Sequence, residues 1–270
     1  MPKRSRRSPP QQQASDYGER SFWEQRYATD ELGSSFEWFA GFEDLEPLLR
    51  DYLPLGPGER EFDPDAARLV DLGCGNSDLL ASLAGAGFQG PLLGVDYSAN
   101  VVEQQRKRVA QRWGAERITF VKQDARDLES FADGSVGFVV DKSTMDTLMH
   151  TESGEAAVTA MLGEVARVLR PGGLYLLLTQ LDPESEHDLE FLTETLLPGL
   201  DCDRHHYAVT AHSSSLVAEG EGGGGGRLHF ISFRKRPRHG MSLRGGEGSG
   251  SVTLTLKDHG GEESDDDDED

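Results

Sequence analysis

The sequence has no long hydrophobic run and very few cysteines. None of its apolar stretches reaches the roughly 20 residues needed to span a bilayer, and residues 1–15 lack the apolar core of a secretory signal. The two cysteines, Cys74 and Cys202, are too few for a disulfide framework or a Cys-x-x-Cys metal site. We therefore expect a soluble, cytoplasmic protein without a metal site and without membrane contact.

Positive charge is also scarce. The chain has 27 Lys and Arg against 48 Asp and Glu, which gives a formal net charge of -21. Such a surface repels phosphates, so we expect no nucleic-acid partner, and a cationic ligand or a basic protein partner fits better. Residues 1–19 are the exception, and we interpret them as a disordered basic arm. Nuclear import is an alternative interpretation of this cluster.

Short apolar runs alternate with helical stretches from residue 67 onward. The runs cover residues 68–72, 92–96, 118–123, 136–141 and 174–179. Helical patterns over 99–113 and 156–169 lie between them. This alternation predicts an α/β fold of the Rossmann-like, doubly wound type, with a mostly parallel sheet and helices on both faces.

The alternation of apolar runs and helical stretches ends after residue 200. Residues 207–212 and 227–235 are predicted to form an antiparallel C-terminal hairpin across a loop with five consecutive glycines, which brings the sheet to seven strands. Residues 252–256 alternate like one more strand without a clear partner. We assign residues 20–240 to one domain and residues 241–270 to a Gly-rich, acidic and mostly disordered tail.

A glycine turn, Asp71-Leu72-Gly73-Cys74-Gly75-Asn76-Ser77, follows the first apolar run. Gly73 and Gly75 permit a tight turn and close approach of a ligand to the backbone. A dinucleotide fingerprint needs glycine at position 78, where Asp78 instead disfavours a pyrophosphate. S-adenosylmethionine has no phosphate and carries a sulfonium that Asp71 can offset. The alternative is that Asp71 only caps the amides of the turn.

Two further acidic residues end neighbouring runs. Asp96 ends the second run, where a carboxylate can accept hydrogen bonds from both ribose hydroxyls. Asp124 follows the third run and is suited to the adenine amino group, with the backbone amide of Ala125 beside the ring. The alternatives are that Asp96 caps the helix at Ser98 and that Asp124 only forms a turn. The spacing favours a nucleoside site.

The fourth run ends in Asp141-Lys142-Ser143-Thr144-Met145-Asp146, at the edge where open α/β sheets bind ligands. Enzymes that methylate nucleobase amino groups carry an Asp/Asn-Pro-Pro-aromatic run here, and its absence argues against DNA or RNA bases as substrates. We predict Asp141 and Asp146 as the catalytic residues that orient a substrate amine.

With these motifs, with Gly-Val-Asp-Tyr-Ser and with Arg-Pro-Gly-Gly, the chain resembles the seven-stranded class I methyltransferases. Within that class, the chain is similar to a group that includes lysine methyltransferases of translation elongation factor 1-alpha. The segments that carry this similarity are Phe22–Tyr27, Phe36–Phe39 and Asp141–Asp146. The resemblance covers roughly residues 20–182. That group has the pattern Lys-Gly-Thr-Leu-Asp, and here Ser143 and Met145 replace its glycine and leucine. The resemblance therefore indicates the cofactor but does not specify the particular protein substrate.

The resemblance implies S-adenosyl-L-methionine as cofactor and a lysine of a basic protein, such as elongation factor 1-alpha, as substrate. The cofactor-binding residues expected from the turn and from the resemblance are Trp23, Tyr27, Trp38, Asp71, Gly73, Gly75, Asp96, Tyr97, Asp124, Ala125 and Lys142. Without the resemblance, core packing is favoured for the N-terminal aromatic residues, and Lys142 could equally be a surface charge beside Asp141. A small-molecule methyltransferase, a catalytically decayed cofactor-binding scaffold and a nucleotide-dependent reductase remain alternatives, and the sequence does not give the oligomeric state.

Overall fold

The computed structural model describes residues 17–29, 35–56, 67–112, 117–202, 205–217, 227–236 and 252–258. Residues 1–16 of the predicted basic arm, the polyglycine loop and the acidic end of the tail lie outside these residues. Within the described part, no helix is both long and apolar enough to cross a membrane. No group of His, Cys, Asp and Glu side chains in that part could hold a metal ion.

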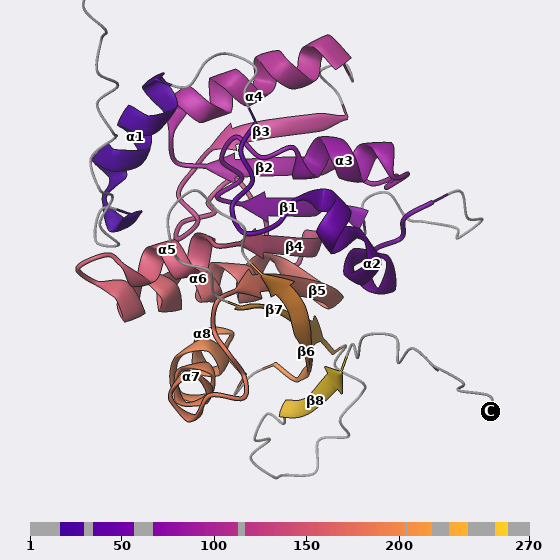
Figure 1. Ribbon diagram of the computed structural model, residues 1–270, viewed down its shortest axis with the longest axis vertical. Coiled ribbons are helices and arrows are strands. Elements are labelled where there is room, and N and C mark those ends of the chain that lie inside the picture. Colours follow the sequence, from indigo (N-terminus) through magenta and orange to yellow (C-terminus); the bar gives the residue numbers. More distant parts are fainter. Residues whose placement is uncertain are drawn as a thin grey trace, which may run out of the picture.

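One eight-stranded sheet forms the centre of the molecule, and Figure 1 shows it running from β3 near the top to β8 at the bottom. The strand order is β3-β2-β1-β4-β5-β7-β6-β8. The strands are β1 (Leu69–Leu72), β2 (Leu92–Asp96), β3 (Ile118–Lys122), β4 (Val136–Lys142), β5 (Leu169–Thr179), β6 (Tyr207–Val217), β7 (Arg227–Lys235) and β8 (Val252–Asp258).

The first five strands are parallel, and β7 pairs antiparallel with both β5 and β6. The predicted mostly parallel sheet with an antiparallel C-terminal hairpin is therefore confirmed. The segment without a clear partner forms β8, which pairs parallel with β6 and adds an eighth strand. In addition, β5 begins at Leu169 rather than near residue 174, because Leu169 pairs with Val136 ahead of a register shift.

Helices cover both faces of the sheet. On one face, an apolar core joins the strands to α2 (Phe42–Tyr52), α3 (Leu79–Gly85) and α4 (Ala99–Arg112). The other core involves α5 (Thr144–Met149), α6 (Gly154–Val168), α7 (Glu186–Phe191), the π-helical turn η3 (Leu192–Leu196) and α8 (Leu197–Gly199). With both faces covered, every residue of β1 and β4 is buried, which explains their continuous apolar runs.

The parallel register brings the carboxyl ends of the strands to one edge. Leu72 at the end of β1 pairs with Val95 in β2 and with Asp141 in β4. The glycine turn, Asp96 and Lys142 are therefore neighbours in space. A further helix, α1 (Arg20–Thr29), packs beside α4 at this edge.

Candidate functional site

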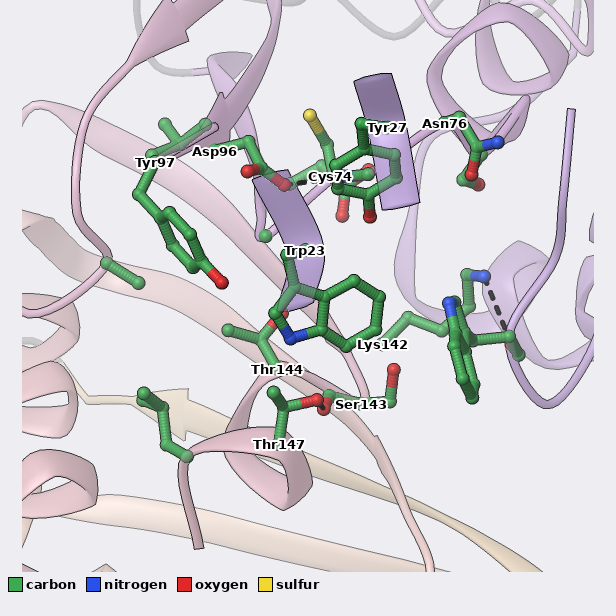
Figure 2. A pocket seen from close by; sticks show the side chains of 18 of the residues that line it. Trp23, Tyr27, Cys74, Asn76, Asp96, Tyr97, Lys142, Ser143, Thr144 and Thr147 are labelled. Atoms are coloured by element: carbon green, nitrogen blue, oxygen red, sulfur yellow. Dashed lines mark hydrogen bonds between the residues drawn. The ribbon is translucent and has the colours of Figure 1, made fainter. Parts of the chain in front are cut away.

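A pocket opens at this edge of the sheet, with about 780 Å³ of space free of protein atoms, part of which is open to solvent. Its walls come from the glycine turn, the ends of β2, β3 and β4, helix α1 and the segment 36–38 (Figure 2). Every residue that the sequence analysis predicted to bind the cofactor lines this pocket. Phe36, Thr144 and Thr147 also line it, although they were not predicted.

The glycine turn needs both of its glycines. Gly73 (φ +60°) and Gly75 (φ +50°) adopt the left-handed backbone conformation that residues with a Cβ rarely adopt. A Cβ at Gly73 would collide with the hydroxyl of Thr144, which donates to the Leu72 carbonyl at 2.7 Å. A Cβ at Gly75 would lie 2.8 Å from the Tyr27 hydroxyl oxygen. The turn is therefore fitted closely between the end of β4 and helix α1.

Helix α4 supports this turn from behind. Buried Gln105 donates from Nε2 to the carbonyls of Gly75 and Ser77, each at 2.8 Å. One turn further along, Arg108 donates to the Ser77 carbonyl at 2.8 Å and pairs with Asp78 at 3.1 Å. Sequence reasoning missed both residues. The available signal was a pair of polar residues three apart on the helix that follows the second strand.

Asp71 is an acidic group in a nearly closed environment, with 3% of the residue exposed. Burial raises its pKa to about 8; Lys142 opposes the shift, whereas Glu37, Asp141 and Asp96 add to it. The group is therefore mostly protonated near pH 7 when the pocket holds no cation. A cationic ligand would favour the ionised form. The chemistry of this wall fits S-adenosylmethionine better than it fits a phosphate.

Asp96 accepts a hydrogen bond at the start of α4, as the capping interpretation predicts, and it also lines the pocket. Its Oδ1 accepts from the Ser98 amide at 2.8 Å, and its Oδ2 accepts from the Gly75 amide at 3.0 Å. Burial raises the pKa of Asp96 to about 6, against the effect of these two hydrogen bonds. Because each carboxylate oxygen can accept a second hydrogen bond, the side chain can still receive a pair of hydroxyls. The two interpretations are compatible.

Asp124 accepts more hydrogen bonds from the protein than Asp96 does. Its Oδ1 accepts from the backbone amide and from Nε of Arg126, both at 2.9 Å, and its Oδ2 accepts from Nη2 at 2.7 Å. These bonds to Arg126 lower the pKa of Asp124. The turn-forming alternative is thus part of the structure, and a ligand amino group would share Oδ2 with Arg126. Buried Ala125 lines the pocket beside it.

Aromatic side chains from the N-terminal part cover the pocket. Trp23 and Tyr27 are buried and stacked, with ring centroids 5.9 Å apart. Trp38 meets Trp23 edge to face at 5.5 Å, and the Trp23 indole donates to the Tyr17 carbonyl at 2.7 Å. These rings form a small core of their own with Val101 of α4. Trp23, Tyr27 and Trp38 therefore pack in this small core and line the pocket at the same time.

Residues 35–40, which we call the strap, are fixed by an acidic residue that the sequence analysis did not select. The Glu37 carboxylate accepts from Lys142 Nζ at 2.8 Å, from the Ser77 hydroxyl at 2.7 Å and from the Asp78 amide at 2.7 Å. Lys142 also donates to the Trp38 carbonyl at 3.1 Å, and only 6% of its side chain is exposed. Lys142 thus joins the end of β4 to the strap, while its stem lines the pocket.

The two predicted catalytic carboxylates do not line the pocket. Asp141 is fully buried: its Oδ1 accepts from the Thr144 amide at 2.8 Å and its Oδ2 from the Tyr175 hydroxyl at 3.0 Å. The Oδ1 of Asp146 accepts from the Thr179 hydroxyl at 2.8 Å. Their hydrogen bonds hold α5 and the end of β5 in place. The predicted orientation of a substrate amine by these two carboxylates stays a prediction.

Comparison with known proteins identifies the family. The model of the family described as "Methyltransferase domain" matches residues 63–207, which is more than half of the chain. The chain belongs to this methyltransferase family. The expected class I fold agrees with a solved structure, geranyl diphosphate C-methyltransferase from Streptomyces coelicolor. That structure aligns with a TM-score of 0.52 over 84% of this chain and 99% of that one, and its 15% identity supports the fold alone.

Two curated relatives from Bos taurus are closer in sequence to this methyltransferase. One, named EEF1A lysine methyltransferase 4, is 31% identical over 227 residues, which are 81% of this chain and 76% of that protein. The other, named eEF1A lysine and N-terminal methyltransferase, is 32% identical over 163 residues. The aligned part is 60% of this chain but 21% of that protein, so the methyltransferase spans about a fifth of its length.

Proposed function

We propose that this chain is an S-adenosylmethionine-dependent methyltransferase that acts on a lysine side chain of translation elongation factor 1-alpha. The observation that carries the proposal is the acidic, aromatic-covered pocket at the carboxyl edge, whose walls suit a cationic nucleoside. The relative that aligns over most of this chain is named for lysine methylation of that factor, and this supports the substrate.

The glycine turn and the ends of β2 and β3 would bind the cofactor. Asp96 and Tyr97 would hold the ribose, and Asp124 with Ala125 would hold the adenine. The backbone at Gly73 would approach the cofactor closely, and ionised Asp71 would offset its cationic end. When bound, S-adenosylmethionine would supply an activated methyl group that an amine lone pair can attack in line, with the carbon–sulfur bond breaking and the neutral thioether S-adenosylhomocysteine as the leaving group.

The protein's share of the reaction is to align the amine and to exclude water. A lysine must lose a proton before its nitrogen can attack. The rings of Phe36 and Trp38 form an apolar wall of the pocket. Such a wall lowers the pKa of an entering amine by desolvation. Glu37 and Lys142 keep the strap that carries these rings in place.

The test combines cofactor binding with substrate labelling. Calorimetry should detect binding of S-adenosylmethionine to the wild type, and Asp96→Ala should weaken it by about a hundredfold because two hydrogen bonds to an ionised group are lost. Asp51→Ala is the matched control, since Asp51 is exposed on α2 and does not line the pocket. Circular dichroism should show both variants folded.

Labelling is then measured with radioactive cofactor, first on purified elongation factor 1-alpha and then on a lysate of the organism. We expect label on a lysine of the factor, located by mass spectrometry. Label found only in small molecules would favour the small-molecule alternative. Binding without any labelled product would indicate a decayed scaffold, and the absence of binding would refute the proposal as a whole.

A further inference from the structure

Ser143 lies in a conformation that its residue type rarely adopts. With φ +73° and ψ 3°, it is in the left-handed region immediately before α5, and it lines the pocket. Glycine reaches this region without strain, whereas a residue with a Cβ does not. This is also where the sequence departs from the glycine of the Lys-Gly-Thr-Leu-Asp pattern. A strained residue kept at a pocket wall points to a role for its side chain.

That role is not helix capping. A serine before the first turn of a helix commonly accepts a hydrogen bond from a backbone amide of that turn. Ser143 makes no such side-chain bond, because Asp141 Oδ1 accepts from the amides of Thr144 at 2.8 Å and Met145 at 3.3 Å. Asp141 thus takes the capping position. The Ser143 hydroxyl is left free to face the pocket, as Figure 2 shows.

The backbone of Ser143 is held firmly while its side chain faces the cavity. Its amide donates to the Leu178 carbonyl at 3.2 Å, and its carbonyl accepts from the Thr147 hydroxyl at 2.9 Å. The backbone that carries this side chain is therefore held by β5 on one side and by α5 on the other. The hydroxyl can change position only by rotation about the Cα–Cβ bond, so a ligand that binds it has few conformations to restrict.

The strand order places this hydroxyl away from the nucleoside end. Asp96 ends β2 and Asp124 follows β3, whereas Ser143 follows β4 on the opposite side of β1 and the glycine turn. At the β4 end, the pocket is lined by Ser143 and Thr147 (Figure 2). Trp38, which also lines the pocket, is held there by its carbonyl, which accepts from Lys142 at the end of β4. A nucleoside held at β2 and β3 leaves this end for the reacting amine.

We infer that Ser143 Oγ accepts a hydrogen bond from the substrate amine and thereby selects amines that still carry an N–H; this assignment rests on the proposed lysine methylation. A neutral lysine nitrogen has two N–H groups, a monomethylated one has one, and a dimethylated one has none. By holding an N–H, the hydroxyl directs the lone pair towards the methyl group. The first two transfers therefore depend on Ser143, and a third does not.

Two substitutions separate the hydroxyl from the backbone strain. Ser143→Gly removes both, so its Tm should rise by roughly 2–4 °C. Ser143→Ala removes the hydroxyl but keeps the Cβ and the strain, so its Tm should stay near that of the wild type. Both should lower kcat/KM for methylation of unmodified elongation factor 1-alpha about tenfold. Their Kd for S-adenosylmethionine should match that of the wild type to within about twofold.

A second substrate tests the dependence on N–H groups. Elongation factor 1-alpha whose lysines have been reductively dimethylated offers no N–H at the neutral nitrogen, so any third transfer should be equally fast in the wild type and in both variants. Equal losses on both substrates would overturn the assignment. If the wild type adds no third methyl, the comparison on the unmodified factor decides.

The remaining outcomes are distinct from one another. Wild-type rates in both variants on the unmodified factor would refute the role of Ser143 and leave the proposed function intact. Loss of cofactor binding in both variants would place Ser143 in the cofactor site and refute its assignment to the amine. No labelled lysine with the wild type would refute the proposed function, and the assignment of Ser143 with it.

Discussion

The buried carboxyl group of Asp71 predicts that cofactor binding is linked to pH. In the protein without ligand, burial raises the pKa of Asp71 to about 8, so the group is mainly protonated at pH 7. A cationic ligand binds the ionised form better, and binding must therefore release a proton. Affinity for S-adenosylmethionine should rise with pH up to about the pKa of the free protein and then level off. Asp71→Asn should remove this dependence.

The magnitude follows from the pKa. With a value of about 8, most Asp71 side chains are protonated at pH 7, so ionisation costs on the order of 1 kcal/mol of binding free energy there and little at pH 9. The affinity should accordingly increase about tenfold between these two values. Complete ionisation on binding would release roughly one proton per ligand at pH 7.

Titration calorimetry in two buffers with different ionisation enthalpies measures this proton release directly. Proton release should fall to near zero in Asp71→Asn, which also weakens binding because the carboxylate is lost. Subtracting the pH profile of this variant removes the titration of the ligand's own amino group. Asp51→Asn serves as the control with an exposed carboxylate and should release the same number of protons as the wild type.

The raised pKa of Asp71 also makes the stability of the fold depend on pH. Because the folded-state pKa of Asp71 lies above its ordinary value of 3.8, the fold favours the protonated form. Its stabilising contribution is complete below about pH 4 and is lost as pH rises through about 8. Thermal denaturation of Asp71→Asn should lack this part of the pH dependence. Wild-type binding without proton release at pH 7, or an unchanged pH slope in the variant, would refute this account of the pocket.

Three other substitutions test the supports of the pocket. Glu37→Gln should lower the free energy of unfolding by about 1–3 kcal/mol in chemical denaturation, because Lys142 keeps its charge but loses its partner; unchanged stability would mean that the pair does not fix the strap. Gln105→Ala should raise the calorimetric Kd for S-adenosylmethionine about tenfold by freeing the glycine turn, and wild-type affinity would contradict that support. Asp141→Ala should cost about 1–3 kcal/mol by leaving the first turn of α5 uncapped and Tyr175 Oη without its acceptor; full stability at equilibrium would contradict the capping role.

The gathering of one set of residues at the carboxyl edge of the sheet could be predicted because these residues follow local rules. Gly73 and Gly75 lie in a short turn after a buried strand, and acidic Asp71, Asp96 and Asp124 lie in or directly after strands that all point in one direction. Parallel strands bring their carboxyl ends to one edge, so residues distant in the sequence meet there. For the same reason, the sheet and its antiparallel hairpin were predicted correctly.

The substrate end could not be predicted in the same way. Asp141 and Asp146 carry charges at the right edge, but whether a carboxylate faces a pocket or a helix amide depends on side-chain direction, which the spacing does not specify. Asp141 turns to the amides of α5, and this leaves Ser143 at the pocket wall. Whether Ser143 adopts a left-handed conformation also depends on the packing of β5 and α5 around it.

The sequence by itself determined the succession of strands and helices along the chain, the glycine turn and the acidic residues at the ends of the strands, because periodicity, chain direction and backbone conformation are local properties. Tertiary structure alone decided how the pocket is closed. Glu37 and Lys142 are 105 residues apart, and Gln105 reaches a carbonyl 30 residues away. Hydrogen bonds of this kind depend on the final position of each side chain, which no pattern within one segment contains.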